Sequence, residues 1–218
     1  MKKKLLACWS LVLMVLPVGA QTMRMQHEAA YETKQPTRVD FVARLSCFFP
    51  DCGYGATPYV ITQDGTYKNH YTVGVGFETD IYFHKQWYAG VGAEVIQSNG
   101  SYVPVNASGE ECRKSLRTTF VLPALVGYNW KAEEKLYLIP STGFAFHYIF
   151  AGSDKYSDAQ GRENSVKLND LKGVDRIGWS WVLNLDAQFE RLLLGCQYSL
   201  GLKPSTPDYV AVRIGWRF

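Results

Sequence analysis

The stretch Tyr209-Val210-Ala211-Val212-Arg213-Ile214-Gly215-Trp216-Arg217-Phe218 decides the fold of this chain. Its even-numbered positions are all apolar and end on aromatic residues, whereas its odd-numbered positions hold arginine, alanine, glycine and tyrosine. A β-strand has a period of two, so alternate residues point to opposite faces. The stretch therefore predicts a strand with one apolar face and one face of small and charged groups.

The N-terminus predicts export. Three lysines at positions 2–4 precede an apolar run over 5–16, and small residues over 17–20 follow. This pattern is typical of a secretory signal peptide and is too short for a membrane anchor. We expect a signal peptide over residues 1–20 and a polar, flexible lead over 21–37. Without the first segment the formal charge falls from +3 to zero, so the basic composition gives no argument for a nucleic-acid partner.

Eight segments after the lead show strand-like alternation. They are expected at 38–48, 69–83, 87–97, 115–130, 135–149, 176–190, 192–203 and 208–218. The connections at 84–86, 131–134 and around 191 are very short, whereas the other side has polar connections over 49–68, 98–114, 150–175 and 204–207. Short turns at one end and longer loops at the other are typical of outer-membrane barrels, which have an even number of strands.

The chemistry of the two faces favours a membrane barrel over a soluble one. In the second segment Val73, Val75 and Phe77 alternate with Gly74 and Glu78, so one face is bulky and the other small or charged. A charge facing lipid costs about 2–4 kcal/mol at the midplane, and the lumen of an eight-stranded barrel is narrow. The sequence therefore predicts an all-β, eight-stranded antiparallel up-and-down barrel over 38–218 in the bacterial outer membrane.

Charges on the inward face nearly balance. The inward set is Arg44, Arg117, Arg176, Arg213, Arg217, Asp40, Glu78, Asp80, Glu94, Asp186 and Glu190. An unpaired charge in a narrow lumen is costly. We therefore expect an interior salt-bridge network, made chiefly by Arg44, Glu78, Asp80, Glu94, Arg117, Asp186, Arg213 and Arg217. Such a network predicts a plugged lumen and not an open pore. Separately, we expect the barrel to be monomeric.

Cysteines offer one structural alternative. Cys47, Cys52 and Cys112 map to the outer rim or loops, and Cys196 maps to the lipid face of a strand. Export permits disulfides. A bridge between Cys47 and Cys52, or between Cys52 and Cys112, would pin the first long loop, and both pairings remain open.

Nothing in the sequence predicts an active site, a metal site or a cofactor. A lipid-modifying hydrolase needs a histidine beside a serine at the lipid-facing surface. His70 and His147 instead fall on inward faces. The acidic stretch over 150–175 does not have the spacing of a calcium-binding loop. We therefore expect a protein that is not an enzyme.

Three segments resemble a known family. The segment Leu122-Pro123-Ala124-Leu125-Val126-Gly127-Tyr128-Asn129-Trp130, the stretch Gln197-Tyr198-Ser199-Leu200-Gly201-Leu202 and the ending Arg213-Ile214-Gly215-Trp216-Arg217-Phe218 resemble strands of the Bacteroidetes outer-membrane β-barrel domain, the PorT-like group. The resemblance implies an eight-stranded barrel with no family catalytic residues. It also implies that Phe218 is the signal read by the outer-membrane assembly machinery, and it allows a role in protein secretion by analogy of fold.

Three functions fit these features. The first is a structural or interaction barrel whose external loops bind an envelope, host or secretion partner, because loops on a rigid scaffold commonly carry binding. The second is a conduit for small solutes or hydrophobic compounds, which needs a wider lumen than the interior charges suggest. The third is a lipid A–modifying enzyme, which the histidine positions disfavour. The first is the leading hypothesis.

Overall fold

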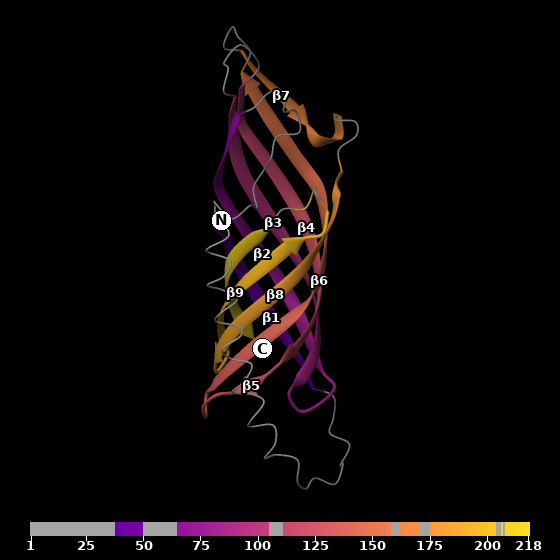
Figure 1. Cartoon of the computed structure of the whole chain (residues 1–218), viewed down its shortest axis with the longest axis vertical. Helices are drawn as coiled ribbons and strands as arrows, with labels where there is room; N and C mark the ends of the chain where they lie inside the picture. Colours follow the sequence, from indigo (N-terminus) through magenta and orange to yellow (C-terminus); the bar gives the residue numbers. More distant parts are fainter. Residues whose placement is uncertain are drawn as a thin grey trace. The chain divides into compact units, whose positions relative to one another are not determined.

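The computed structural model describes residues 38–49, 65–104, 111–157, 162–170, 175–203, 206 and 208–218. Eight long strands form one closed antiparallel barrel: β1 (Arg38–Phe48), β2 (Gly65–Tyr82), β3 (Trp87–Pro104), β4 (Glu111–Tyr128), β6 (Leu136–Ser157), β8 (Ile177–Phe189), β9 (Leu192–Gly201) and β10 (Tyr209–Arg217). Each pairs with its neighbours in chain order, and the pairing of β1 with β10 closes the ring (Figure 1). The predicted eight-stranded barrel is confirmed.

Three small elements complete the described part. β5 (Trp130–Lys131) pairs with the start of β6, and β7 (Glu163–Lys167) pairs with its end. A short 3-10 helix, η2 (Leu168–Asp170), follows β7. Among the described residues, no helix has both the length and the apolar character needed to cross a membrane.

The short turns lie where the sequence predicts them. Tyr82 is followed by β3 at Trp87, and Phe189 is followed by β9 at Leu192. Glu190, in the tightest of these turns, has φ 54°, a left-handed conformation that non-glycine residues adopt mainly in such turns. Because short turns mark the periplasmic end of outer-membrane barrels, β1 begins and β10 ends on the periplasmic side.

The strands are very unequal in length, and this corrects the predicted loops. β2, β3 and β4 have 18 residues each and β6 has 22, whereas β1, β8, β9 and β10 have 9 to 13. The longer strands continue beyond their shorter neighbours on one side of the barrel (Figure 1). We call this projecting sheet the crest, and it consists of 65–72 of β2, 98–104 of β3, 111–118 of β4, 149–157 of β6, and β7.

Much of 98–114 and 150–175 is therefore strand and not loop. The sequence does not reveal it, because these segments lack apolar alternation. That alternation arises where one face meets lipid. The crest keeps the backbone pairing of a sheet, but its outward face does not carry the alternating apolar residues that contact hydrocarbon, so the strands there are recognised from their pairing alone.

The outer wall below the crest is apolar, as predicted. Val75, Phe77 and Phe144 are 57–63% exposed, although each is a large hydrophobic residue. Their inward neighbours Glu78 and Asp80 are at most 2% exposed. An apolar surface of this extent, with charges turned inward, is the surface that membrane lipid covers.

The lumen contains two apolar clusters that the sequence does not predict. One lies toward the periplasmic end and contains Val42, Tyr82, Tyr88, Ile139 and Leu193. The other lies toward the outer end and contains Phe48, Ile96, Val121, Leu125, Ala145, Val182, Tyr209 and Ala211. On β1, Val42 and Phe48 belong to different clusters and Arg44 lies between them. The charged side chains around Arg44 therefore lie between two apolar layers.

Candidate functional site

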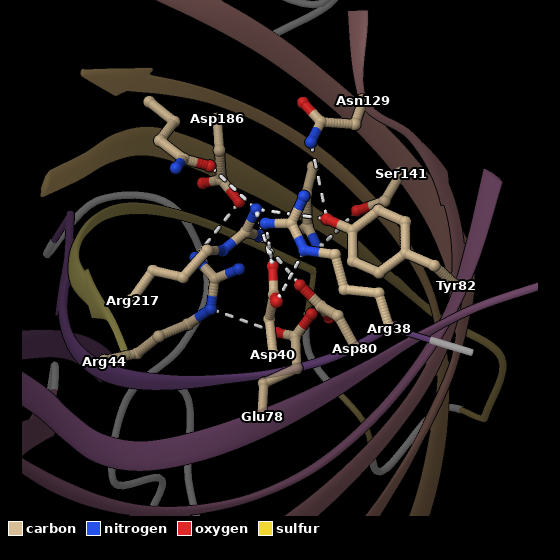
Figure 2. A network of polar contacts seen from close by, with 12 residues as sticks. Arg38, Asp40, Arg44, Glu78, Asp80, Tyr82, Asn129, Ser141, Asp186 and Arg217 are labelled. Atoms are coloured by element: carbon tan, nitrogen blue, oxygen red, sulfur yellow. Dashed lines mark hydrogen bonds and ion pairs between the residues drawn. The ribbon is translucent and has the colours of Figure 1, made fainter. Parts of the chain in front are cut away.

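The centre of the lumen holds three linked ion pairs. Arg44 Nε lies 3.0 Å from Glu78 Oε2, and Arg44 Nη1 lies 3.0 Å from Asp186 Oδ2. Arg213 Nη2 lies 3.3 Å from the same Glu78 oxygen. These side chains come from β1, β2, β8 and β10 and are at most 5% exposed (Figure 2). Glu78 therefore forms ion pairs with two arginines and links them in one network.

A second cluster lies nearer the periplasmic end. Arg217 Nη2 lies 2.8 Å from Asp80 Oδ2, and Arg217 Nη1 lies 3.7 Å from Asp40 Oδ2. Arg217 also donates hydrogen bonds to the Tyr82 hydroxyl and to Gln188 Oε1. Arg38, at the start of β1, pairs with Asp40 at 2.6 Å (Figure 2). The last strand therefore makes ion pairs in the lumen at two heights, through Arg213 and through Arg217.

A third cluster lies in the crest, away from the other two along the strands. Arg117 Nη1 lies 2.6 Å from Asp154 Oδ1, and both side chains are at most 4% exposed. Ser115 donates a 2.7 Å hydrogen bond to Asp154, and the Tyr156 hydroxyl donates another at 3.2 Å. Asp154 is absent from the predicted network because it falls in a segment read as loop. The register of β6 against β4 is what reveals it.

Among the described residues Glu94 forms no ion pair, although the sequence places it in the network. It lines a cavity of about 10 Å³ together with Arg213, Gly76 and Pro123. This volume holds about one water molecule. Pro123 has no backbone N–H, and the β3–β4 ladder is interrupted at this point, between Val91↔Ala124 and Glu94↔Val121.

Two further predicted inward charges are not in the lumen. Arg176 is partly exposed and donates to the carbonyl of Leu168 and to Asn169 Oδ1. Glu190 is exposed in the periplasmic turn, where it pairs with Lys135 at 2.9 Å. Both residues lie at strand ends, where the alternation that predicts an inward side chain no longer applies.

Among the described residues one histidine–serine contact is found, inside the barrel. His147 Nε2 lies 2.8 Å from Ser180 Oγ, and the two residues are 4% and 0% exposed. Both face the lumen and not the lipid, so a lipid substrate in the membrane has no access to them. In the described part of the chain, no three His, Cys, Asp or Glu side chains gather in a way that could hold a metal ion.

This geometry is that of a membrane barrel, and comparison with known families agrees. Residues 37–206 match the family described as outer membrane protein beta-barrel domain. The chain belongs to this family. It is an outer-membrane protein, and its apolar outer wall lies in the membrane lipid.

Solved outer-membrane barrels share the architecture at low identity. OprG from Pseudomonas aeruginosa is 11% identical, with a TM-score of 0.47 over 86% of this chain and 99% of that chain. Ail from Yersinia pestis, solved in complex with the heparin analogue sucrose octasulfate, is 13% identical, with a TM-score of 0.37 over 84% of this chain and 97% of that chain. At such identities the likeness concerns the fold alone. No curated protein matches the sequence.

The cysteines of this family member limit the disulfide alternatives. Cys47 is a free thiol on the outward face of β1, so a bridge from Cys47 to Cys52 is not formed. Cys52 lies outside the described residues, as does the side chain of Cys112, so a bridge between these two remains a prediction. Cys196 is exposed on the outward face of β9, as predicted.

Proposed function

We propose that this outer-membrane barrel is a non-conducting interaction protein that presents its crest to a partner outside the cell. The main support for this proposal is the difference in strand length, since β6 has 22 residues and β10 has 9. Seven to nine residues beyond the shorter strands correspond to a sheet about 20 Å tall at the tilt of barrel strands. A rigid sheet of this height has no role in spanning the membrane, but it can carry a binding surface.

The contents of the lumen support the absence of conduction. Two apolar clusters lie above and below the central ion pairs, and side chains alone fill a lumen of eight strands. A conduit for solutes would need an open path through both clusters. Purified monomer in planar bilayers is therefore expected to give no stable channel. A large, long-lived conductance would contradict this part of the proposal.

Site-specific photocrosslinking in living cells tests the interaction. A photoreactive amino acid is placed in the crest at Asn164 or Val166, on the face of β7 opposite to its outward face, and at Val75 or Phe144 in the lipid-facing wall as matched controls. Discrete protein adducts are expected from the crest positions, whereas the wall positions are expected to give none or lipid only. If the crest positions give no protein adduct, or the wall gives the same ones, the crest is not the binding surface.

The identity of a crosslinked protein also shows whether the partner is an envelope protein, a host protein or a component of a secretion system. The PorT-like resemblance favours a partner in protein secretion, and mass spectrometry of the adduct would recognise such a component. The signal peptide over 1–20 and the lead over 21–37 lie outside the described residues. We propose, as the sequence predicts, that residues 1–20 are a signal peptide and that residues 21–37 are a polar lead. We also propose that Phe218 is the signal for outer-membrane assembly.

A further inference from the structure

Two lysines stand directly opposite each other on the outward face of the crest. Lys114 of β4 is paired in register with Lys155 of β6. Both are exposed, whereas the adjacent residues Ser115 and Asp154 are completely buried on the inward face. Side chains of directly opposed residues in an antiparallel pair have Cβ atoms about 5 Å apart. Two ammonium groups are therefore held side by side by the register itself.

A third lysine joins them from β7. Ser153 of β6 is paired with Lys167, and Lys155 is paired with Ser165. Lys167 therefore shares the outward face and lies diagonal to Lys155, about 7–8 Å away between the strands. We call Lys114, Lys155 and Lys167 the lysine patch. Glu163 lies on the other diagonal of Lys155, and the register also brings Glu111 of β4, which is paired with Ser157, close to the patch.

The lysine patch carries an electrostatic cost that no ion pair among the described residues offsets. Like charges directly opposite each other destabilise a sheet. The ion pairs of the described residues include none of the three lysines, whereas Lys135 and Lys203 are each paired with an acid. An anion between the ammonium groups would remove the repulsion. The arrangement is therefore that of an anion site open to the side of the barrel.

The height of the patch indicates where the anion comes from. Lower on the same outward face, Leu122 of β4 and Phe144 of β6 are exposed to lipid. Phe150, 45% exposed, is the last exposed large apolar residue on β6, and Lys155 lies five residues beyond it. Five residues along a tilted strand rise about 13 Å. The face thus changes from apolar to basic where hydrocarbon gives way to the polar headgroups.

We propose that the lysine patch binds phosphate groups of the glycolipid that forms the outer leaflet. The occupant is a membrane lipid and not a soluble polyanion, because the patch faces sideways on the continuation of the lipid-facing wall. Ammonium groups suit this role, since they bind phosphate as mobile point charges. The inference is independent of the partner proposed above, because it concerns lipid on the outward face of the sheet.

Binding of purified lipid A to the full-length protein in detergent micelles tests the proposal. The variant combines Lys114→Gln, Lys155→Gln and Lys167→Gln. The control removes the same charge at the periplasmic end through Lys85→Gln, Lys131→Gln and Lys135→Gln, three exposed lysines. Binding is followed by native mass spectrometry with phosphorylated lipid A, with enzymatically dephosphorylated lipid A, and with phosphorylated lipid A in excess inorganic phosphate.

The wild type and the control are expected to bind phosphorylated lipid A alike. Each basic residue near an anionic surface contributes about fivefold in affinity, so the triple variant should bind on the order of a hundredfold more weakly. Dephosphorylated lipid A should bind the wild type as weakly as phosphorylated lipid A binds the triple variant. Heat-modifiable migration in gels reports folding, and Lys155→Gln alone, with about a fivefold loss, replaces the triple variant if that does not fold.

Three results would overturn the proposal. The first is unchanged affinity in the lysine-patch variant that folds. The second is equal binding of dephosphorylated lipid A, which would show that the acyl chains alone are recognised. The third is complete competition by inorganic phosphate at millimolar concentration, which would show that the patch is a site for soluble phosphate.

Discussion

Replacing Glu78 by glutamine tests whether the central network stabilises the barrel. Glu78 is 2% exposed and pairs with Arg44 at 3.0 Å and with Arg213 at 3.3 Å. Glutamine keeps the shape and removes the charge. Arg44 then still has Asp186, whereas Arg213 loses the one acid with which the described residues show it paired.

The expected loss in free energy of unfolding follows from the buried charge of Arg213, which Glu78→Gln leaves without its acid. Removing one partner of a buried ion pair costs about 3–5 kcal/mol, mostly because the other charge stays buried without compensation. Arg213→Gln should cost less, since Glu78 then keeps Arg44. The network therefore predicts a definite order of the two variants. Glu190→Gln is the matched control, because that carboxylate pairs with Lys135 in the exposed periplasmic turn and should matter little.

Urea unfolding of the refolded protein in lipid vesicles measures the effect. Tryptophan fluorescence follows the transition, and its midpoint and slope give the free energy of unfolding. The expected order of destabilisation is Glu78→Gln, then Arg213→Gln, then Glu190→Gln. The reasoning is refuted if Glu78→Gln unfolds at the same urea concentration as Glu190→Gln, or if Arg213→Gln is the more damaging of the two buried changes.

Three other changes have expected outcomes. Gly143→Ala should prevent assembly, because a Cβ there would collide with the main chain of β4. Gly215→Ala should fold, because the atom nearest to its added Cβ is 3.3 Å away. Heat-modifiable migration in gels compares the folding of the two variants. Deletion of Phe218 should lower the amount inserted in the outer membrane several-fold, measured by fractionation, with the lumen network intact in the molecules that do fold. Asp154→Asn should remove the buried ion pair with Arg117, which should loosen the crest and raise its hydrogen exchange relative to the membrane-embedded strands.

The barrel itself could be predicted from the sequence because lipid imposes a period-two pattern. Alternation such as that of Val73, Val75 and Phe77 identifies both the strands and their outward face. The lumen is harder to predict. In Leu192-Leu193-Leu194 both faces are apolar, and only the pairing with β8 and β10 shows that Leu193 points inward. The apolar layers of the lumen therefore escape a pattern-based prediction.

The interior charges are predictable as a group but not as pairs. Sequence alternation selects Arg44, Glu78 and Arg213 as inward, yet their heights along the lumen depend on strand stagger. Stagger is also why Asp154 and the lysine patch cannot be found from sequence. Lys114 and Lys155 are 41 positions apart in the chain and become neighbours only through the register of β4 against β6.

The ion pairs that Arg213 and Arg217 form in the lumen also affect how the barrel closes. Buried ion pairs add little net stability compared with apolar side chains of the same size, so stability alone does not account for them. A slip of two residues between β1 and β10 would keep every apolar side chain facing lipid, and alternation alone does not forbid it. Such a slip would move Arg213 and Arg217 along the lumen, away from Glu78 and Asp80. We infer that the arginines of the closing strand select its register, while the alternating apolar residues select its face.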